Sequence, residues 1–374
     1  MEFSSGLAEC VNDLEIVQER VLLVQKRLQR VGVEEERVKA SALRLTKERE
    51  ELVNLAGLTR VHRKFGRMLL KTTAEMELKA VEANIEESGR RLRSNEVETR
   101  IARQEVEILE EELSDLESKE ATASLTVAIQ GLLRTQPSLQ RSGRWLCFST
   151  PTPPMLQQGP QCGLVALTMA VRALGKNQHS VSTAFQLAKE RGFSKLGELF
   201  SVDSMASLAV ELLPECKVDI MKSSKLEDTA WVVNVLLTGS LMLVPYDCTP
   251  DHSPGLAGGQ KAHWALVTGF MVRCSNSKGL SSSCLPILGC PNFYELPNTT
   301  IQPALTNSLE LMLVARQSKS VKLGLWPAQH LALSCENLRQ AADKRLDGSY
   351  VLPEDGNLQK LSGRIVILSK QEKY

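Results

Sequence analysis

The first third of this 374-residue sequence contains no proline, no tryptophan and no tyrosine. Only Phe3 and Phe65 are aromatic before residue 126, whereas all 15 prolines lie from Pro137 onward. Proline interrupts helices, and aromatic side chains fill compact cores. These absences therefore exclude a single globular core that draws evenly on the whole chain.

Long hydrophobic runs and paired cysteines are also missing. No apolar run approaches the roughly 20 residues that cross a bilayer, and the stretch from Met1 to Cys10 lacks the apolar core of a secretory signal. The nine cysteines include no Cys-x-x-Cys pair, which argues against a disulfide framework and a structural zinc site. We expect a soluble, cytoplasmic protein with reduced thiols, no metal, no other cofactor and no membrane partner.

Charge is balanced over the whole chain but not along it. The 45 Lys and Arg against 44 Asp and Glu leave a net charge of +1, which argues against a dedicated nucleic-acid binder. Residues 1–125 hold 21 basic and 26 acidic side chains, so their net charge is −5 and that of the rest is +6. We predict a helical unit at 1–120, a linker at 121–143 and a mixed α/β domain at 144–374.

Apolar residues recur at alternating spacings of three and four in two stretches of the helical unit. The first seam comprises Leu7, Cys10, Leu14, Val17, Val21, Val24, Leu28, Val31, Val38, Ala42, Leu45 and Leu52. The second comprises Leu78, Val81, Ile85, Leu92, Ala102, Val106, Leu109, Leu113 and Leu116. Heptads sustained over this length predict an antiparallel coiled coil, for which a dimerisation rod is the plainest role.

Residues 61–70 interrupt the heptads and are β-capable, so we expect a small β-hairpin near 60–73. Two charged helices around a β segment with Gly-Arg-Met at 66–68 resemble the β-type prefoldin subunits, most closely subunit 1, over about residues 8–120. The resemblance implies assembly with other prefoldin subunits through the hairpin and a co-chaperone role toward unfolded actin and tubulin. His62, in the same segment, is expected at the surface or in the hairpin.

The second unit carries the candidate chemistry, centred on Cys162. It lies in the sequence Leu-Gln-Gln-Gly-Pro-Gln-Cys-Gly at 156–163, directly before an apolar, helix-capable run. Pro160 ends any earlier helix, so Cys162 is expected at a new helix N-terminus, where unpaired N–H groups favour a thiolate. A glutamine shortly upstream can direct its amide at an oxyanion. The alternative is that Cys162 is only a small buried hydrophobic residue.

A cysteine nucleophile needs a base, and His263 is the candidate. It opens an apolar, strand-like run that follows a loop rich in Gly and Pro, where an imidazole can face a thiol on a helix. The alternative is a core imidazole with satisfied hydrogen bonds. His179, His252 and His330 are expected on the surface.

Together, the segment around Cys162 and the His-Trp pair at 263–264 resemble the papain-like cysteine proteases of the C39-like kind. With Gln-Ser-Lys-Ser at 317–320, they are similar to the actin maturation protease family over about residues 144–370. The resemblance implies an α+β, papain-like domain, here preceded by the coiled coil. It also implies an aminopeptidase that removes the N-acetylated first residue, Met or Cys, from immature actin.

The same resemblance assigns roles within the site. Cys162 matches the nucleophile, His263 the general base and Gln157 the oxyanion donor, while Gln158 remains open as a competing donor. In such a reaction the thiol attacks a carbonyl, and the imidazole takes the thiol proton and passes it to the leaving amine.

The residue that would orient the imidazole is left open. Gln317 ends an apolar strand, roughly where related folds place Asp or Asn, and Asn292 is the alternative. The net charge of +6 suits an acidic substrate tail such as that of actin. The proline-rich leader that docks profilin in this family is reduced here to a few prolines, so profilin is not expected as a partner.

Three interpretations of the whole chain follow. It is an actin-processing cysteine aminopeptidase with extra helices, a prefoldin-like co-chaperone subunit with an appended protease domain, or the product of a gene model that joins two adjacent genes. The presence of Cys162, His263 and Gln157 together favours the enzyme. A mass near 41 kDa for the endogenous chain would support one polypeptide.

Overall fold

Two compact units make up the part of the chain that the structure describes. The computed structural model describes residues 2–58, 64–140, 143–175, 179–274, 284–296, 310–352 and 355–370. One unit is Asn12–Leu116, and the other comprises Met1–Val11 and Glu117–Tyr374. Within the described ranges, no helix has both the length and the apolar content needed to span a bilayer.

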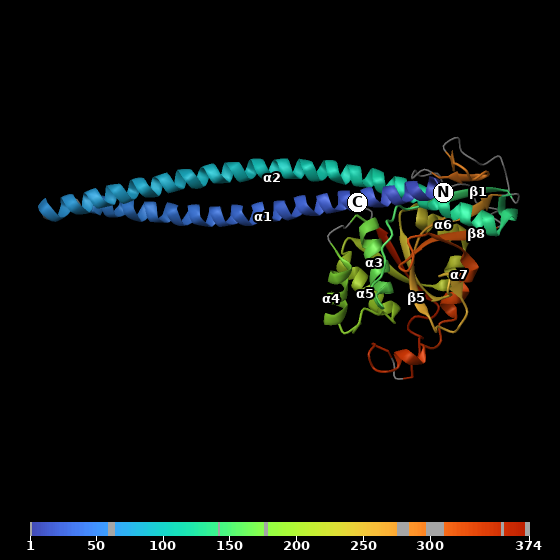
Figure 1. The fold of residues 1–374 in the computed structure, drawn as a ribbon. Coiled ribbons are helices and arrows are strands. Elements are labelled where there is room, and N and C mark those ends of the chain that lie inside the picture. The colour runs from blue at the N-terminus through green and yellow to red at the C-terminus, as the bar shows by residue number, and fades with distance from the viewer. Residues whose placement is uncertain are drawn as a thin grey trace. The chain divides into compact units, whose positions relative to one another are not determined.

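The unit Asn12–Leu116 is a pair of helices formed from α1 (Glu2–Leu58) and α2 (Lys64–Thr135) (Figure 1). The buried residues of its core are Val17, Val21, Val24, Ala102, Leu109 and Leu113. All of them belong to the predicted heptad seams. The alternating spacing keeps them on one face of each helix, so each helix covers the apolar face of the other.

Ion pairs between the two helices define their direction. Arg20 pairs with Glu112 at 3.6 Å, and Arg49 pairs with Glu82 at 3.3 Å. A later residue of α1 therefore faces an earlier residue of α2, which makes the pair antiparallel. All four side chains are about half exposed, so these pairs add little stability and mainly favour one register.

The prediction of a β-hairpin near 60–73 is wrong for the residues described there. Helix α2 begins at Lys64 and continues through the rest of that segment, while 59–63, with His62, lie outside the described residues. Arg, Met, Leu and Lys favour a helix, and a single Gly66 costs only about 1 kcal/mol relative to alanine. The described chain therefore offers no counterpart of the hairpin through which prefoldin subunits would join.

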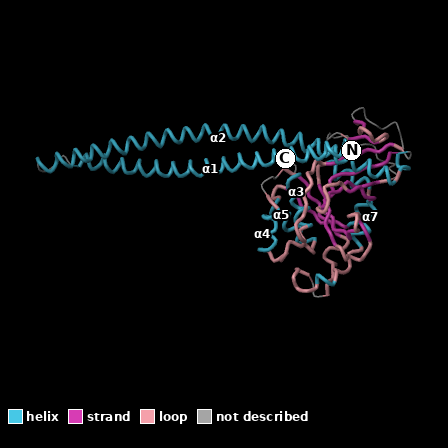
Figure 2. The backbone as a smooth tube through the Cα atoms, viewed as in Figure 1, coloured by secondary structure: helices cyan, strands magenta, loops and turns pink. Residues whose placement is uncertain are grey.

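The second unit is α+β and is built on a mixed sheet, drawn in magenta in Figure 2. Its strands are β1 (Arg144–Ser149), β2 (Cys216–Lys222), β3 (Leu241–Cys248), β4 (Pro254–Gly255), β5 (Ala262–Cys274), β6 (Leu285–Pro286), β7 (Phe293–Glu295), β8 (Leu311–Gln317), β9 (Gly324–Pro327) and β10 (Arg364–Lys370). The main order is β2-β10-β3-β5-β1-β7-β6, with β4 paired to β3 and with β8 paired to both β5 and β9. Among the strand pairs of the described residues, only β1 and β7 run parallel.

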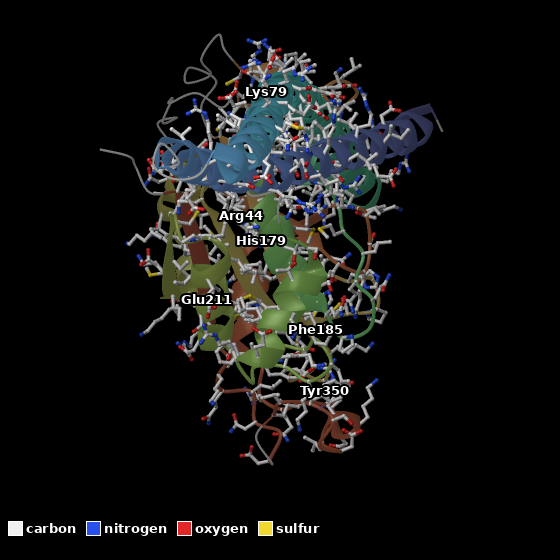
Figure 3. All side chains as sticks on the ribbon, turned by 90° about the vertical axis from the view of Figure 1, so that its left-hand side faces the viewer. Arg44, Lys79, His179, Phe185, Glu211 and Tyr350 are labelled. Carbon is white, nitrogen blue, oxygen red and sulfur yellow. The ribbon has the colours of Figure 1, made fainter. Side chains whose placement is uncertain are left out.

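Helices cover both faces of this sheet. They are α3 (Cys162–Ala173), α4 (Val181–Glu190), α5 (Val202–Leu212), α6 (Thr229–Leu237) and α7 (Ala328–Glu336), with short 3₁₀ turns at Pro137–Gln140, Ser223–Glu227 and Asp343–Arg345. Figure 3 looks onto the layer of α3, α4 and α5.

Strand β5 separates the two cores because its side chains alternate between the faces. Trp264 and Leu266 pack with α3, α4 and α5, whereas Ala265 and Val267 pack with α6 and α7. Strands β3 and β8 both run antiparallel to β5. The start of β5 and the ends of β3 and β8 therefore meet at one edge of the sheet.

The linker predicted at 121–143 is wrong, because α2 continues to Thr135. Leu125 and Ile129 of this segment are buried and pack against β1, β5 and β8. The chain meets no proline before Pro137, and the apolar spacing of four residues keeps a helical face on the sheet. The boundary between the units accordingly falls near residue 117 rather than 144.

A buried ion pair fastens this end of α2 to the sheet. Arg316 of β8 donates to both carboxylate oxygens of Glu120, at 2.8 and 2.9 Å, and each side chain is at most 2% exposed. The same guanidinium donates to the carbonyls of Thr152 and Val321. The last turns of α2 are thus part of the α+β unit, tied to the segment that leads to Cys162.

Candidate active site

Cys162 is the first residue of α3, as the sequence predicted. The next residue, Gly163, lets the helix approach the sheet closely, since a Cβ there would lie 2.9 Å from the Trp264 ring and 3.2 Å from Leu199. The Trp264 indole donates to the Leu199 carbonyl at 2.9 Å and fixes this contact. The Cys-Gly sequence therefore seats the thiol against the start of β5.

The thiol lies among donors and positive charges, but burial dominates its ionisation. Burial raises the pKa of Cys162, while the main-chain N–H groups of Trp264 and Gly163 and the charges of Arg345 and Lys319 lower it. The net shift is upward. The predicted thiolate is therefore not favoured in the free protein, because loss of solvent outweighs the helix N-terminus.

His263 is the residue before Trp264, whose main-chain N–H lowers the pKa of the Cys162 thiol. Among the described residues no hydrogen bond joins the imidazole to this thiol, and the His263 side chain lies on the opposite face of β5 from Trp264. Its ring packs edge-on against Tyr246, its partner across β3 and β5, with centroids 5.6 Å apart. Its Nε2 atom is buried and has no hydrogen-bond partner in the described chain. The imidazole is thus not the core histidine with satisfied hydrogen bonds that was the alternative.

Burial also controls the charge of the imidazole. It lowers the pKa of His263 to about 3, with smaller contributions from the positive charges of Lys319, His252 and Arg345. A neutral imidazole accepts a proton, and a neutral thiol supplies one. Near pH 7 the free site consequently holds a neutral thiol and a neutral base.

This neutral pair predicts the pH dependence of thiol alkylation. Because the pKa of Cys162 is raised, its thiolate fraction should grow about tenfold per pH unit below that pKa, and so should the iodoacetamide rate between pH 6 and 8. Mass mapping of the labelled cysteine gives the measurement. A rate that stays constant down to pH 5 would instead show a preformed thiolate–imidazolium pair.

Gln157 is clamped next to the end of β8. Its main-chain N–H donates to the Ser318 carbonyl at 2.8 Å, and its side-chain oxygen accepts from the Ser318 hydroxyl at 2.7 Å. Its amide nitrogen donates to the Gly159 carbonyl at 2.6 Å, which uses one of two N–H groups. One donor therefore remains for an oxyanion, whereas Gln158 is exposed and has no such clamp in the described structure.

The two candidates for orienting the imidazole differ in position. Gln317 is buried on β8, and its side-chain oxygen accepts from the Lys319 N–H at 2.7 Å. It pairs with Ala265, so it shares a face of the sheet with His263 but is not bonded to it. Asn292 instead is exposed and donates to the Gln140 carbonyl at 3.0 Å, just before β7.

Asp247 is a buried residue at this edge that the sequence analysis did not identify. Its two carboxylate oxygens accept from the N–H groups of Gly259 and Lys261, at 3.1 and 3.2 Å. These bonds hold the turn that leads into Ala262 and His263. A lone Asp at the end of an apolar strand gave the only signal, and it does not reveal long-range partners.

The other described histidines differ in how exposed they are. His330 is exposed on α7 and His179 is half-buried before α4 (Figure 3). His252 departs from the surface prediction: it is half-buried, with Nδ1 4.0 Å from Cys248 Sγ and its carbonyl accepting from the Tyr246 hydroxyl at 3.0 Å. Cys248 and His252 therefore form a thiol–imidazole contact at the same edge of the sheet.

No group of three or more His, Cys, Asp or Glu among the described residues could hold a metal ion.

A cleft of about 320 Å³ opens at the same edge of the sheet. Strand β8 and the turn after it supply part of its wall, and the last turns of α2 supply another. Its lining residues are Ala128, Gly131, Leu132, Thr135, Asp251, His252, Ser253, Gln317, Ser320, Lys322, Leu323, Gly324, Leu325 and Trp326. The lining combines apolar side chains with hydroxyl, amide and charged groups, Asp251 and Lys322 among them, so the cleft can take a small side chain together with polar groups beside it.

Comparison with known proteins identifies relatives of this chain. Residues 152–271 match a family model described as actin maturation protease-like, C-terminal domain. The chain is 32% identical to the actin maturation protease of Danio rerio over 244 residues, which cover 62% of this chain and 77% of that protein. Identity to the Mus musculus protein is 34% over 256 residues, 65% and 70% of the two chains. No solved structure matches.

Proposed function

Because this chain belongs to the actin maturation protease family, we propose that it is a cysteine aminopeptidase that removes the N-acetylated first residue, Met or Cys, from immature actin. The observation that carries the proposal is the position of Cys162 at the start of α3, with two main-chain N–H groups directed at its sulfur. We further propose that the reaction takes place in the cytoplasm.

In the proposed reaction the Cys162 sulfur attacks the carbonyl carbon of the first residue while His263 accepts the thiol proton. The side chain of His263 shares its face of the sheet with Tyr246, whereas α3 packs on the Trp264 face. The proposed proton transfer therefore requires the imidazole to reach the thiol around the edge of the sheet. The free N–H of Gln157 donates to the oxyanion. The imidazolium then protonates the leaving amine, and water hydrolyses the thioester.

The neutral resting pair is compatible with this route. Proton transfer from thiol to imidazole occurs as the sulfur attacks, so a preformed thiolate is not required. We propose that Gln317 turns its amide toward the buried Nε2 of His263 when substrate is bound, because it lies on the same face of the sheet. We also infer a papain-like arrangement of helix and sheet, and supercoiling of the α1–α2 pair.

The function is tested with an acetyl-Met-Asp-Asp-Glu peptide and the full chain. Release of acetylmethionine, followed by mass spectrometry, is expected with the wild-type protein and not with Cys162→Ser. Cleavage further along the peptide, or an equal rate for the serine variant, would contradict the assignment.

The cleft gives a prediction about substrate binding. An added Cβ at Gly131 would meet no atom within 4 Å, so Gly131→Leu is expected to fold and to extend into the cleft. Leucine also favours the helix more than glycine does. If the first residue of the substrate binds there, kcat/KM should fall about tenfold, mainly through a higher KM. Arg134→Leu, exposed on the same helix and outside the cleft lining, is the matched control; a loss that is equal in both variants would reject the cleft.

A further inference from the structure

Two positive charges without an acidic partner lie within electrostatic range of the thiol. They belong to Arg345, in the 3₁₀ turn Asp343–Arg345, and Lys319, two residues after β8. Among the described residues, no carboxylate forms an ion pair with either of them. Other cations of this unit differ in this respect: Arg364 pairs with Asp203, whereas Lys344 has no ion pair within the described chain. Arg345 and Lys319 are singled out because their charges also act on the thiol.

Arg345 is held in place and still has a free donor. Its guanidinium lies over the Phe200 ring, 5.3 Å from the centroid, and Phe200 packs edge-on against Tyr350. Its Nη1 atom is buried and has no hydrogen-bond partner in the described chain. A buried N–H group without an acceptor costs free energy, so an acceptor supplied by a ligand would be stabilised strongly.

The loop that carries Phe200 connects Arg345 to the nucleophile. Leu199 packs beside Gly163, directly after Cys162, and its carbonyl accepts from the Trp264 indole. The cation on Phe200 is thus fixed relative to the first turn of α3.

Lys319 reaches the site from a different loop. Its main-chain N–H is bonded to the Gln317 side chain, and the preceding Ser318 makes the two bonds that clamp Gln157. The lysine side chain itself is exposed, so its ammonium is free to follow a ligand. The positive charges of Lys319 and Arg345 both lower the pKa of Cys162 and of His263, which places both cations within electrostatic range of the reacting atoms.

We propose that Arg345 and Lys319 are specificity residues that bind the carboxylates of an acidic peptide segment next to the scissile bond. The inference rests on the proposed function and adds the groups that would recognise an Asp- or Glu-rich terminus. A guanidinium binds a carboxylate in a fixed, directional geometry, whereas an ammonium acts as a compact point charge. Arg345 would therefore fix the position of one carboxylate, and Lys319 would attract the other carboxylates of the segment without fixing their orientation.

The test compares two substrates in the full chain. Acetyl-Met-Asp-Asp-Glu and acetyl-Met-Asn-Asn-Gln have nearly the same shape and differ in charge. The ratio of their kcat/KM values measures recognition of the carboxylates. We expect the wild-type protein to prefer the acidic peptide. This preference should weaken as salt is raised from about 0.05 to about 0.5 M, because the screening length becomes about threefold shorter.

Arg345→Gln is expected to reduce the preference about tenfold, and Lys319→Gln by a smaller factor. Lys344→Gln is the matched control, because Lys344 is an exposed cation that neighbours Arg345 and does not act on the thiol. Its ratio should equal that of the wild type.

The outcomes distinguish a wrong role for Arg345 and Lys319 from a wrong protease function. If the wild-type protein cleaves the acidic peptide but Arg345→Gln and Lys319→Gln keep its preference, the assignment of these residues is wrong and the proposed function stands. Equal losses on both peptides would show that Arg345 serves only the fold, and would also overturn the inference. If the wild-type protein cleaves neither peptide, the proposed function itself fails.

Discussion

Cys162→Ala is expected to lower turnover of an acetylated actin peptide by about 10⁴- to 10⁶-fold, because it removes the sulfur that forms the proposed acyl intermediate. The fold should persist, since the thiol is at the first residue of α3 and only half-buried, so its removal leaves a small gap. Circular dichroism and the urea midpoint of the purified variant would confirm the fold. His263→Ala should approach the same loss, because thiol and base act as a unit.

The sharpest control for this prediction is the neighbouring thiol. Cys248 lies 4.0 Å from a nitrogen of His252 and accepts a hydrogen bond from Tyr246, so it is a thiol with an imidazole neighbour at this sheet edge. It is on a strand rather than at a helix start, and Cys248→Ala should keep most of the turnover. If Cys248→Ala abolished cleavage and Cys162→Ala did not, the nucleophile would be Cys248.

Glu120→Leu is expected to cost about 3–5 kcal/mol of folding free energy, because it leaves Arg316 charged and buried without a counter-ion. Urea denaturation of the full chain gives the measurement. The double variant Glu120→Leu with Arg316→Met removes both charges and replaces them with apolar side chains, so most of the loss should be recovered. A double variant as unstable as the single one would show that the charge itself is not the cause.

The same ion pair determines where the chain can be shortened. A fragment that starts at residue 117 keeps Glu120 and the apolar face of α2, and we expect it to fold and to remain active. A fragment that starts at residue 144, the boundary predicted from the sequence, loses both and should aggregate or unfold. Equal stability of the two fragments would contradict the role assigned to the end of α2.

Local signals in the sequence were sufficient for some elements. Pro160 followed by an apolar run predicted the start of α3 at Cys162, and the heptad spacing predicted the buried residues of the helix pair. These features depend on neighbours within one or two turns. The helix through Lys64 departs from the predicted hairpin because a long helix can absorb one glycine, and β-capable residues alone do not end it.

Long-range features could not be predicted in this way. The partner of Glu120 is 196 residues away, so nothing near residue 120 distinguishes the end of α2 from a linker. The charge state of Cys162 was predicted from the helix N-terminus alone, whereas burial by β5 and its neighbours reverses the direction of the pKa shift. The orphaned N–H of Arg345 is a property of packing and leaves no pattern in the sequence.

The distance along the chain between Glu120 and Arg316 also matters during synthesis. The 196 residues that separate them take roughly 10 to 40 s to translate at 5–20 residues per second. For that time, the apolar face formed by Leu125 and Ile129 has no β8 to pack against. The helix pair Asn12–Leu116 needs no later residue for its own core, so it can form first on the ribosome. During this time the nascent chain consists of a folded helix pair followed by a helical end whose apolar face is exposed. We therefore expect aggregation of the nascent chain to involve this end before the α+β unit has folded.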